Sequence, residues 1–314
     1  MNVQYIDPLS RGFERMKSAL FQPFDPKIWF VVGFTAFLAG LTDYHRGGDT
    51  GFKNRGSVNW EDILYLPEKI WEWLINNPLW FTLVIIAMVV IIILAVLFTW
   101  LSSRGKFMFL DNVIHRRALV VAPWHEYRRE GNSLFVWSFS FGLLAFGIIV
   151  VYVVTCFLSL YGLYEGTNDS GLLIAPAIFM GLGLITMFLL ISFIELLLED
   201  FIVPIMYKNR VSMVEALRLF FPLLVAHFFR FFAYALLVLL VTVFLIAGIV
   251  MVGLLTCCIG FLVLIIPYIN AVVLLPISYT MRAFSVEFLE QFGPEYHFFP
   301  RRATNPATTE TTTS

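Results

Sequence analysis

The sequence predicts an all-α, polytopic integral membrane protein with six transmembrane helices. The clearest observation is the segment Leu79 to Leu101, which contains 23 residues and no charge. At a rise of about 1.5 Å per residue, a helix of that length crosses the roughly 30 Å hydrocarbon core of a bilayer. The composition agrees, because 59% of the 314 residues are hydrophobic, 14% are charged and the mean hydropathy is +0.82. A soluble domain carries about 25% charged residues.

Six apolar stretches are the expected spans, within a transmembrane domain that covers residues 28–282. They are residues 28–41, 79–101, 134–161, 172–198, 231–252 and 261–281. The first is short for a bilayer, so we expect it to recruit flanking residues. Pro267 and Pro276 predict kinks in the sixth, because proline removes a helical hydrogen bond. Pro204 is expected to close the region of the fourth span.

Amphipathic helices are expected outside the spans. Residues 1–27 predict a cytoplasmic interfacial helix, in which Asp7 and Pro8 provide the N-cap and the first helical residue. A second such helix is expected within the extracytoplasmic loop of residues 43–78. The sequence Ser212-Met-Val-Glu215 is a capping box and predicts a short helix that ends before Pro222. Residues 283–314 form the predicted cytoplasmic tail, disordered from about residue 300 because it has little to bury.

The lysines and arginines predict the orientation. Seventeen of the 21 lie in the N-terminal segment, in the links after the second and fourth spans, and in the C-terminal tail. The other four, between the first two spans, are Arg46, Lys53, Arg55 and Lys69. Basic residues accumulate on the cytoplasmic side, so both termini are expected in the cytoplasm.

An internal repeat is suggested by three occurrences of Ala-Leu followed by proline. They begin at Ala19, Ala118 and Ala216, with spacings of 99 and 98 residues. Each opens a basic amphipathic helix, an outward span and a returning span, which predicts three tandem helical hairpins in one orientation. Chance is the competing explanation, because alanine, leucine and proline are common.

A family resemblance rests on four segments. They are Leu198-Glu-Asp-Phe-Ile-Val-Pro-Ile-Met-Tyr, Val211-Ser-Met-Val-Glu-Ala-Leu, Ile266-Pro-Tyr and Leu275-Pro. In these the chain resembles uncharacterised bacterial six-span proteins and, more distantly, the membrane domain fused to some glycerophosphodiester phosphodiesterases. The resemblance covers nearly the whole chain, but its motifs are structural and of low specificity. It implies a six-helix fold in a bacterial cytoplasmic (inner) membrane. It carries over no catalysis, because the catalysis of those fusions resides in a separate soluble domain.

Polar residues within or beside the spans are the candidate functional residues, because charge in a bilayer is costly. Glu195 and Glu199 lie one turn apart, where they would bind a cation, relay protons or, for Glu199, pair with a nearby arginine. His227 and Arg230 share a helix face, and Asn270 lies between the two prolines of the sixth span. Hydrogen bonding between helices is the simpler role for His227 and Asn270. Six basic residues of the second link are candidates for contact with lipid headgroups: Arg104, Lys106, Arg116, Arg117, Arg128 and Arg129.

Catalytic and cofactor chemistry has no sequence signature here. No metal-ligand spacing, nucleotide-binding loop or nucleophile motif occurs in a usable context, so no cofactor, metal or catalytic residue is predicted. The three cysteines, Cys156, Cys257 and Cys258, are expected to be packing residues. Nucleic-acid binding is not expected of so apolar a protein.

We therefore expect a non-enzymatic membrane module that binds lipids, a partner membrane protein or a second copy of itself. Two functions of other classes stay open. One is a channel or transporter, which needs a polar cavity lined by Glu195 and Asn270. The other is a lipid-modifying intramembrane enzyme, which needs Glu195, His227 and Asn270 at one depth.

Overall fold

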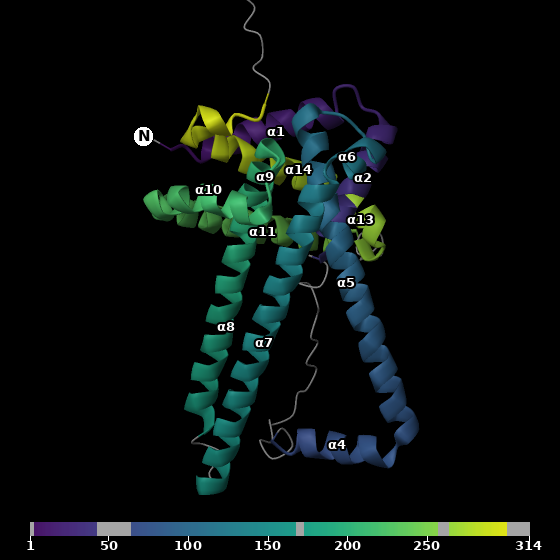
Figure 1. Ribbon diagram of the computed structural model, residues 1–314, viewed down its shortest axis with the longest axis vertical. Helices are drawn as coiled ribbons and strands as arrows, with labels where there is room; N and C mark the ends of the chain where they lie inside the picture. The colour runs from purple at the N-terminus through teal and green to yellow at the C-terminus, as the bar shows by residue number, and fades with distance from the viewer. Residues whose placement is uncertain (1–2, 43–63, 168–172, 257–263, 300–314) are drawn as a thin grey trace, which may run out of the picture.

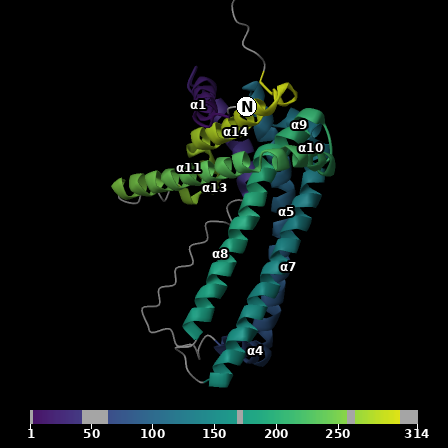
Figure 2. The same cartoon turned by 90° about the vertical axis from the view of Figure 1, so that its left-hand side faces the viewer.

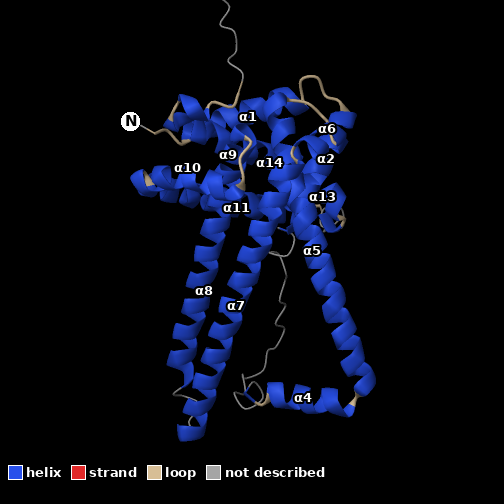
Figure 3. Cartoon of the chain, in the orientation of Figure 1, coloured by secondary structure: helices blue, strands red, loops and turns tan. Residues whose placement is uncertain are grey.

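The computed structural model describes residues 3–42, 64–167, 173–256 and 264–299, and every regular element in these ranges is a helix (Figure 3). The expected all-α class is confirmed for them. Several predictions fall outside the described residues: most of the extracytoplasmic loop, the tail from about residue 300, and the packing of Cys257 and Cys258.

Three long helices extend in a common direction from a cluster of shorter ones (Figure 1). They are α5 (Pro78–His115), α7 (Arg128–Thr167) and α8 (Ile174–Leu197). Helices α7 and α8 lie side by side, where the Tyr152 hydroxyl donates to the Met180 carbonyl over 3.1 Å. Helix α5 diverges from them, and α4 (Leu66–Asn76) lies across their far end. There the rings of Tyr65 and Tyr161 meet edge to face at 6.2 Å.

The opposite end is a bundle that we call the helical head. It consists of the head-side part of α5 with α1 (Ile6–Leu20), α2 (Pro26–Ala39), α6 (Val121–Glu126), the π-helix η3 (Leu198–Ile202), α9 (Val203–Asn209), α10 (Met213–Ala226), α14 (Leu275–Leu289), η4 (Glu290–Phe292) and η5 (Pro294–Tyr296). Helix α13 (Pro267–Val273) packs beside α2. Helix α2 is thus part of the head, whereas α4 lies at the far end of α5 (Figure 1).

Four helical stretches are long and apolar enough to cross a membrane. They are Pro78–His115, Arg128–Gly166, Ile174–Asn209 and Phe228–Leu255, and the α13–α14 pair, bent by 64°, makes a fifth if counted as one span. The most apolar windows of the first and third bury none of their residues in the protein. Such surfaces are stable in lipid and not in water, so the chain is a multi-pass membrane protein. The count of six spans is not confirmed, because Pro26–Thr42 is a shorter apolar helix.

Helix α11 (Phe228–Leu255) does not run beside the other long helices. Figure 2 shows it extending across the direction of α7 and α8. Its head-side end is held by the fully buried side chains of Phe231 and Tyr234. The Tyr234 ring stacks on Phe284 at 5.1 Å, and Phe231 meets Phe201 at 4.9 Å. Aromatic packing in the head, which the hydropathy pattern does not encode, therefore sets its direction.

Helix α1, which the sequence predicts to lie at the membrane interface, packs along α14. A Cβ at Gly12 would lie 3.0 Å from the Phe284 backbone nitrogen, so the glycine allows close contact. Arg11 and Arg15 both pair with Glu287, whose side chain is 2% exposed. The amphipathic pattern thus serves a helix–helix interface, in which Met16 and Leu20 are also buried.

Two proline predictions need correction. Helix α10 continues through Pro222 to Ala226, although its capping box forms as expected. The Ser212 N–H donates to Glu215 over 3.0 Å, and this bond lowers the pKa of that carboxyl. Pro204 likewise does not end the fourth apolar helix: the chain widens into the π-turn η3 and continues as α9 to Asn209. A proline removes one hydrogen bond, and a local π adjustment lets the helix continue past it.

Three elements of the head share a local pattern. Each contains a fully buried phenylalanine: Phe107 in α5, Phe201 in η3 and Phe284 in α14. Nine residues after each, the backbone has a positive φ: 50° at Arg116, 56° at Arg210 and 157° at Gly293. The Ala-Leu segments themselves take different places, at the end of α1, before α6 and inside α10. The tandem repeat therefore stays a prediction.

Close packing of α5 on α2 depends on Gly105. A Cβ there would lie 2.6 Å from the Ala39 backbone nitrogen. We expect Gly105→Ala to force α2 away and to lower the free energy of unfolding by about 1–3 kcal/mol. Thermal unfolding in detergent, followed by tryptophan fluorescence, measures this. The control is Gly147→Ala on α7, where a Cβ meets nothing within 4 Å and stability should hold or rise. Equal effects of the two substitutions would contradict the packing described.

Candidate functional site

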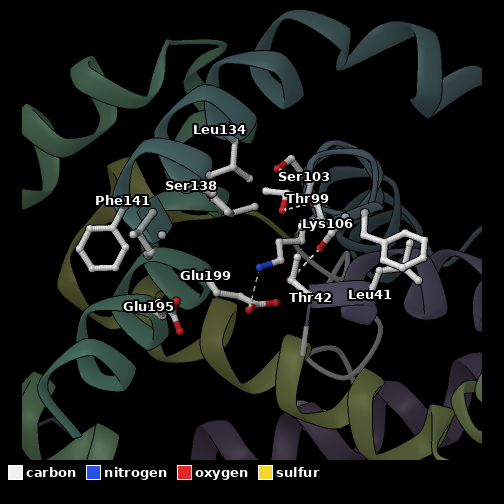
Figure 4. A pocket seen from close by; sticks show the side chains of 16 residues that line it. Leu41, Thr42, Thr99, Ser103, Lys106, Leu134, Ser138, Phe141, Glu195 and Glu199 are labelled. Atoms are coloured by element: carbon white, nitrogen blue, oxygen red, sulfur yellow. Dashed lines mark hydrogen bonds and ion pairs between the residues drawn. The ribbon is translucent and has the colours of Figure 1, made fainter. Parts of the chain in front are cut away.

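A cavity of about 360 Å³ lies where α5 separates from α7 and α8 at the edge of the helical head (Figure 4). Four parts of the chain supply its wall: the end of the α2 region, α5, α7 and the run from α8 to α9. Its lining residues are Leu41, Thr42, Ala95, Phe98, Thr99, Ser102, Ser103, Lys106, Leu134, Ser138, Phe141, Gly142, Glu195, Leu198, Glu199 and Val203.

The cavity is polar toward the head and more apolar toward the long helices. Along α5 the lining runs from Ala95 to Lys106, a rise of about 16 Å for an α-helix. Ala95 and Gly142, at the end away from the head, are exposed on the protein surface. Since these parts of α5 and α7 belong to membrane-spanning stretches, that end of the cavity faces lipid.

An ion network forms the head side of the cavity. The Lys106 ammonium donates to Glu199 Oε2 over 3.1 Å, and Arg282 Nη2 donates to Glu199 Oε1 over 2.7 Å. Arg282 Nη1 also donates to the Glu199 carbonyl at 2.8 Å. The Tyr234 hydroxyl donates to Asp200 at 2.9 Å, and Arg282 lies 3.8 Å from the same carboxylate. Buried charges persist only with such partners, because leaving one unpaired is expensive.

The π-turn η3 places the two acidic groups. Pro204 has no N–H to donate to the carbonyl of Asp200, the partner it would have in a regular helix. The helix widens over Leu198–Ile202, and Glu199 contacts α5 and α14 from this widened turn. Such single π-turns are frequent at functional sites.

The wall has five hydroxyl residues, and four of them have committed their hydrogens to other protein atoms. Thr99 donates to the Ala95 carbonyl and Ser103 to the Thr99 carbonyl, both at 2.8 Å. Ser102 donates to the Ala39 carbonyl at 2.7 Å, which leaves Thr42 as the donor in its 3.1 Å bond with Ser102. A hydroxyl has one hydrogen and two lone pairs, so these oxygens can offer the cavity acceptors but no donors.

A second polar cluster surrounds Asp111, whose side chain is fully buried in α5. Arg117 donates to both carboxylate oxygens at 2.7–2.9 Å, and the Tyr207 hydroxyl donates at 2.8 Å. His115 Nδ1 lies 3.2 Å from Asp111. The hydrogen bond to Asp111 raises the pKa of Arg117, and burial raises the pKa of Tyr127, which stacks on Tyr207 at 4.7 Å. The cluster fastens α9 to the end of α5.

The predicted intramembrane residues fall at separate places. Glu195 and Glu199 share the cavity wall, one on α8 and the other on η3 (Figure 4). The His227 ring lies against Phe292 at 5.4 Å, between α10 and α11, and Arg230 is in the first turn of α11. Asn270 is on α13. None of these last three residues lines the cavity.

The predicted headgroup contacts divide into an inner and an outer set. Arg104 is 9% exposed, with its guanidinium over the rings of Trp100 and Trp124 at 4.6 and 4.8 Å. Lys106 points into the cavity network (Figure 4). In contrast, Arg116, Arg128 and Arg129 are exposed on the helical head and Arg117 is half-buried. Of the six residues predicted to contact headgroups, these four keep side-chain surface outside the protein interior.

Sequence reasoning missed Arg282, Asp111 and the hydroxyl groups of α5. Arg282 counts in the sequence as a basic residue of the tail, yet its side chain is 5% exposed. Asp111 is one of two acidic residues, with Glu126, in the basic stretch of residues 104–129. The only signal for the hydroxyls is that Thr42, Thr99, Ser102 and Ser103 lie at the ends of two neighbouring apolar segments. Among the described residues, no group of three or more histidine, cysteine or acidic side chains is placed to hold a metal ion.

The ion network is expected to hold α14 in place. Arg282→Met leaves the half-buried Glu199 and Asp200 with less compensating charge, which we expect to lower the free energy of unfolding by about 1–3 kcal/mol. Chemical denaturation in detergent measures this. Arg218→Met on α10, where the arginine is exposed, is the matched control and should have little effect. Similar stabilities of the two variants would refute a structural role for the network.

Comparison with known proteins identifies a family and no function. The family described as "Family of unknown function (DUF7544)" matches residues 3–289, nearly the whole chain. No curated protein and no solved structure matches the chain. Because the match extends from the residues before α1 to the end of α14, it includes the long helices, the helical head and the cavity between them. The chain belongs to the DUF7544 family.

Proposed function

We propose that this protein is a non-enzymatic, lipid-binding module of the bacterial cytoplasmic membrane. The observation that carries the proposal is the cavity between α5, α7 and α8. One end offers charged and hydroxyl groups, and the other reaches the lipid-facing surface at Ala95 and Gly142. This is the polarity of a membrane lipid, so a headgroup would enter the polar end while its chains lie along α5 and α7.

The exposed basic residues of the helical head support a second contact with lipids. Arg116, Arg128 and Arg129 are held on rigid turns or helix ends beside the long apolar helices. A lysine or arginine near an anionic membrane surface contributes about 1 kcal/mol each. These residues would hold the head against the headgroup layer.

A channel or transporter is less well supported. That function requires a polar path through the bilayer, and Asn270, its second predicted residue, is on α13 outside the cavity. An intramembrane enzyme requires convergent acid, base or nucleophilic groups, and Glu195, His227 and Asn270 belong to three separate sites. A partner protein or a second copy would instead use the exposed helix faces.

We also propose six spans with both termini in the cytoplasm, which would put α1 on the cytoplasmic side of the helical head. The short apolar helix Pro26–Thr42 would be the first span, α5, α7 and α8 the next three, and α11 and the bent α13–α14 pair the last two. The 17 basic residues on the proposed cytoplasmic side support this orientation. The resemblance to the membrane domain of glycerophosphodiester phosphodiesterase fusions would then reflect a shared six-span plan.

Reporter fusions test the topology. Alkaline phosphatase, active only outside the cytoplasm, should be active when fused after Arg55 or after Thr256 and inactive when fused after Arg117 or Phe299. Green fluorescent protein should give the reverse pattern. Activity after Arg55 with none after Thr256 would mean that α11 stays at the level of the head, as its transverse direction in Figure 2 would suggest, and would refute the six-span count.

Filling the cavity should remove bound lipid. Gly142 lines the cavity, Gly147 is five residues further along α7, and a Cβ at either meets nothing within 4 Å. We expect Gly142→Leu to reduce the lipid retained by purified protein severalfold, because its side chain occupies the entrance, whereas Gly147→Leu retains it. Native mass spectrometry and lipid extraction measure the retained lipid. Equal retention by the two variants, or a solute flux in proteoliposomes that Gly142→Leu blocks, would overturn the proposal.

A further inference from the structure

The lining of the cavity is rich in hydrogen-bond acceptors and carries charges of both signs. Its ionisable residues are Lys106, Glu195 and Glu199, and Arg282 is bonded to Glu199, so these four side chains have no formal net charge. Both oxygens of Glu199 are already bonded, to Lys106 and to Arg282. Glu195 adds an acidic group one helical turn away on the same wall (Figure 4). A ligand that complements this wall presents a cationic group to Glu195 and an anionic group to Lys106.

The hydroxyl groups of the wall restrict the chemistry of the cationic group further. Thr42, Thr99, Ser102 and Ser103 each use their hydrogen within the protein, so the lone pairs of their oxygens are what they can present to a ligand. A quaternary ammonium has no N–H and would leave these acceptors without donors, which is costly in a buried site. A primary ammonium has three N–H donors.

We infer that the cavity selects lipids whose headgroup ends in a primary ammonium, such as phosphoethanolamine. This inference rests on the proposed function and adds a headgroup to it. The ammonium lies among Glu195 and the hydroxyl oxygens of α5. The phosphate of the same headgroup accepts from Lys106, whose ammonium has further N–H groups besides the one directed at Glu199. The acyl chains leave past Phe98 and Gly142 toward the bilayer.

A methylation series tests the headgroup. Delipidated protein is titrated with phosphatidylethanolamine, its N-methyl and N,N-dimethyl derivatives, and phosphatidylcholine, all with the same acyl chains, and binding is read by native mass spectrometry. Affinity should fall with each methyl group, by about tenfold or more across the series, because each removes an N–H donor. Soluble glycerophosphoethanolamine, which has the headgroup without acyl chains, should bind far more weakly than the lipid.

Two substitutions test the wall. Glu195→Gln removes its charge and Thr99→Val its acceptor oxygen at nearly constant shape, and each should flatten the methylation series. The matched control is Thr155→Val on α7, which loses the same kind of bond, Thr155 to the Val151 carbonyl at 2.8 Å, outside the cavity. It should leave the series unchanged. If Glu195→Gln fails to fold, the comparison of Thr99→Val with Thr155→Val still decides the test.

The outcomes separate this inference from the proposed function. Equal affinity for all four lipids, abolished by Gly142→Leu, overturns the headgroup inference and leaves lipid binding intact. No lipid binding, or binding that Gly142→Leu does not affect, overturns both. Glycerophosphoethanolamine binding as tightly as the lipid shows that the ligand is a soluble amine and overturns the lipid as its source.

Discussion

The ion network of Lys106, Glu199 and Arg282 is the interaction on which the helical head depends. It joins three segments that are far apart in sequence, α5, η3 and α14, and Asp200 and Tyr234 extend it to α11. Each charge needs the others, because a buried unpaired ion costs far more than the pair contributes. The aromatic core around Phe201 packs against this same junction, with Phe220, Phe231 and Tyr234 at 4.9–5.7 Å. The network and this aromatic core together hold the ends of these helices in one place.

Apolar surface is removed from water in two ways in this protein: by close packing within the head and by contact with lipid along the long helices. In the head, glycines allow backbones to approach: a Cβ at Gly105 would lie 2.6 Å from Ala39, and one at Gly33 would lie 2.6 Å from the Val272 side chain. In the most apolar stretches of α5 and α8 no residue is buried inside the protein, and these side chains are left to lipid. At the edge of the head, α5 diverges from α7 and α8, and the cavity forms at that point. Its mixed lining therefore follows from its position between a charged head and a lipid-facing stem, and it is the basis of the lipid-binding proposal.

Part of the fold and of the site is readable from the sequence. The long apolar runs that became α5, α7, α8 and α11 are readable because a bilayer imposes length and composition directly on each helix. The capping box at Ser212 is a local signal and forms as expected. Glu195 and Glu199 stood out because acidic residues are rare beside apolar spans, and both line the cavity. His227, Arg230 and Asn270 stood out for the same reason but lie elsewhere, since rarity along a chain says nothing about which helices become neighbours.

Local chemistry therefore determined what the sequence alone could supply: helical class, membrane insertion, and the polar residues that need partners. The tertiary structure decided the rest. Pro204 widens a helix into η3 where it was expected to end one, because neighbouring segments hold both sides of the turn. Arg282 changes from a tail residue to the partner of Glu199, and α11 runs across α7 and α8, because contacts between distant residues set helix direction. Those contacts depend on geometry that no periodicity in one segment records, and they place the hydroxyl acceptors of α5 opposite Glu195 in a single cavity.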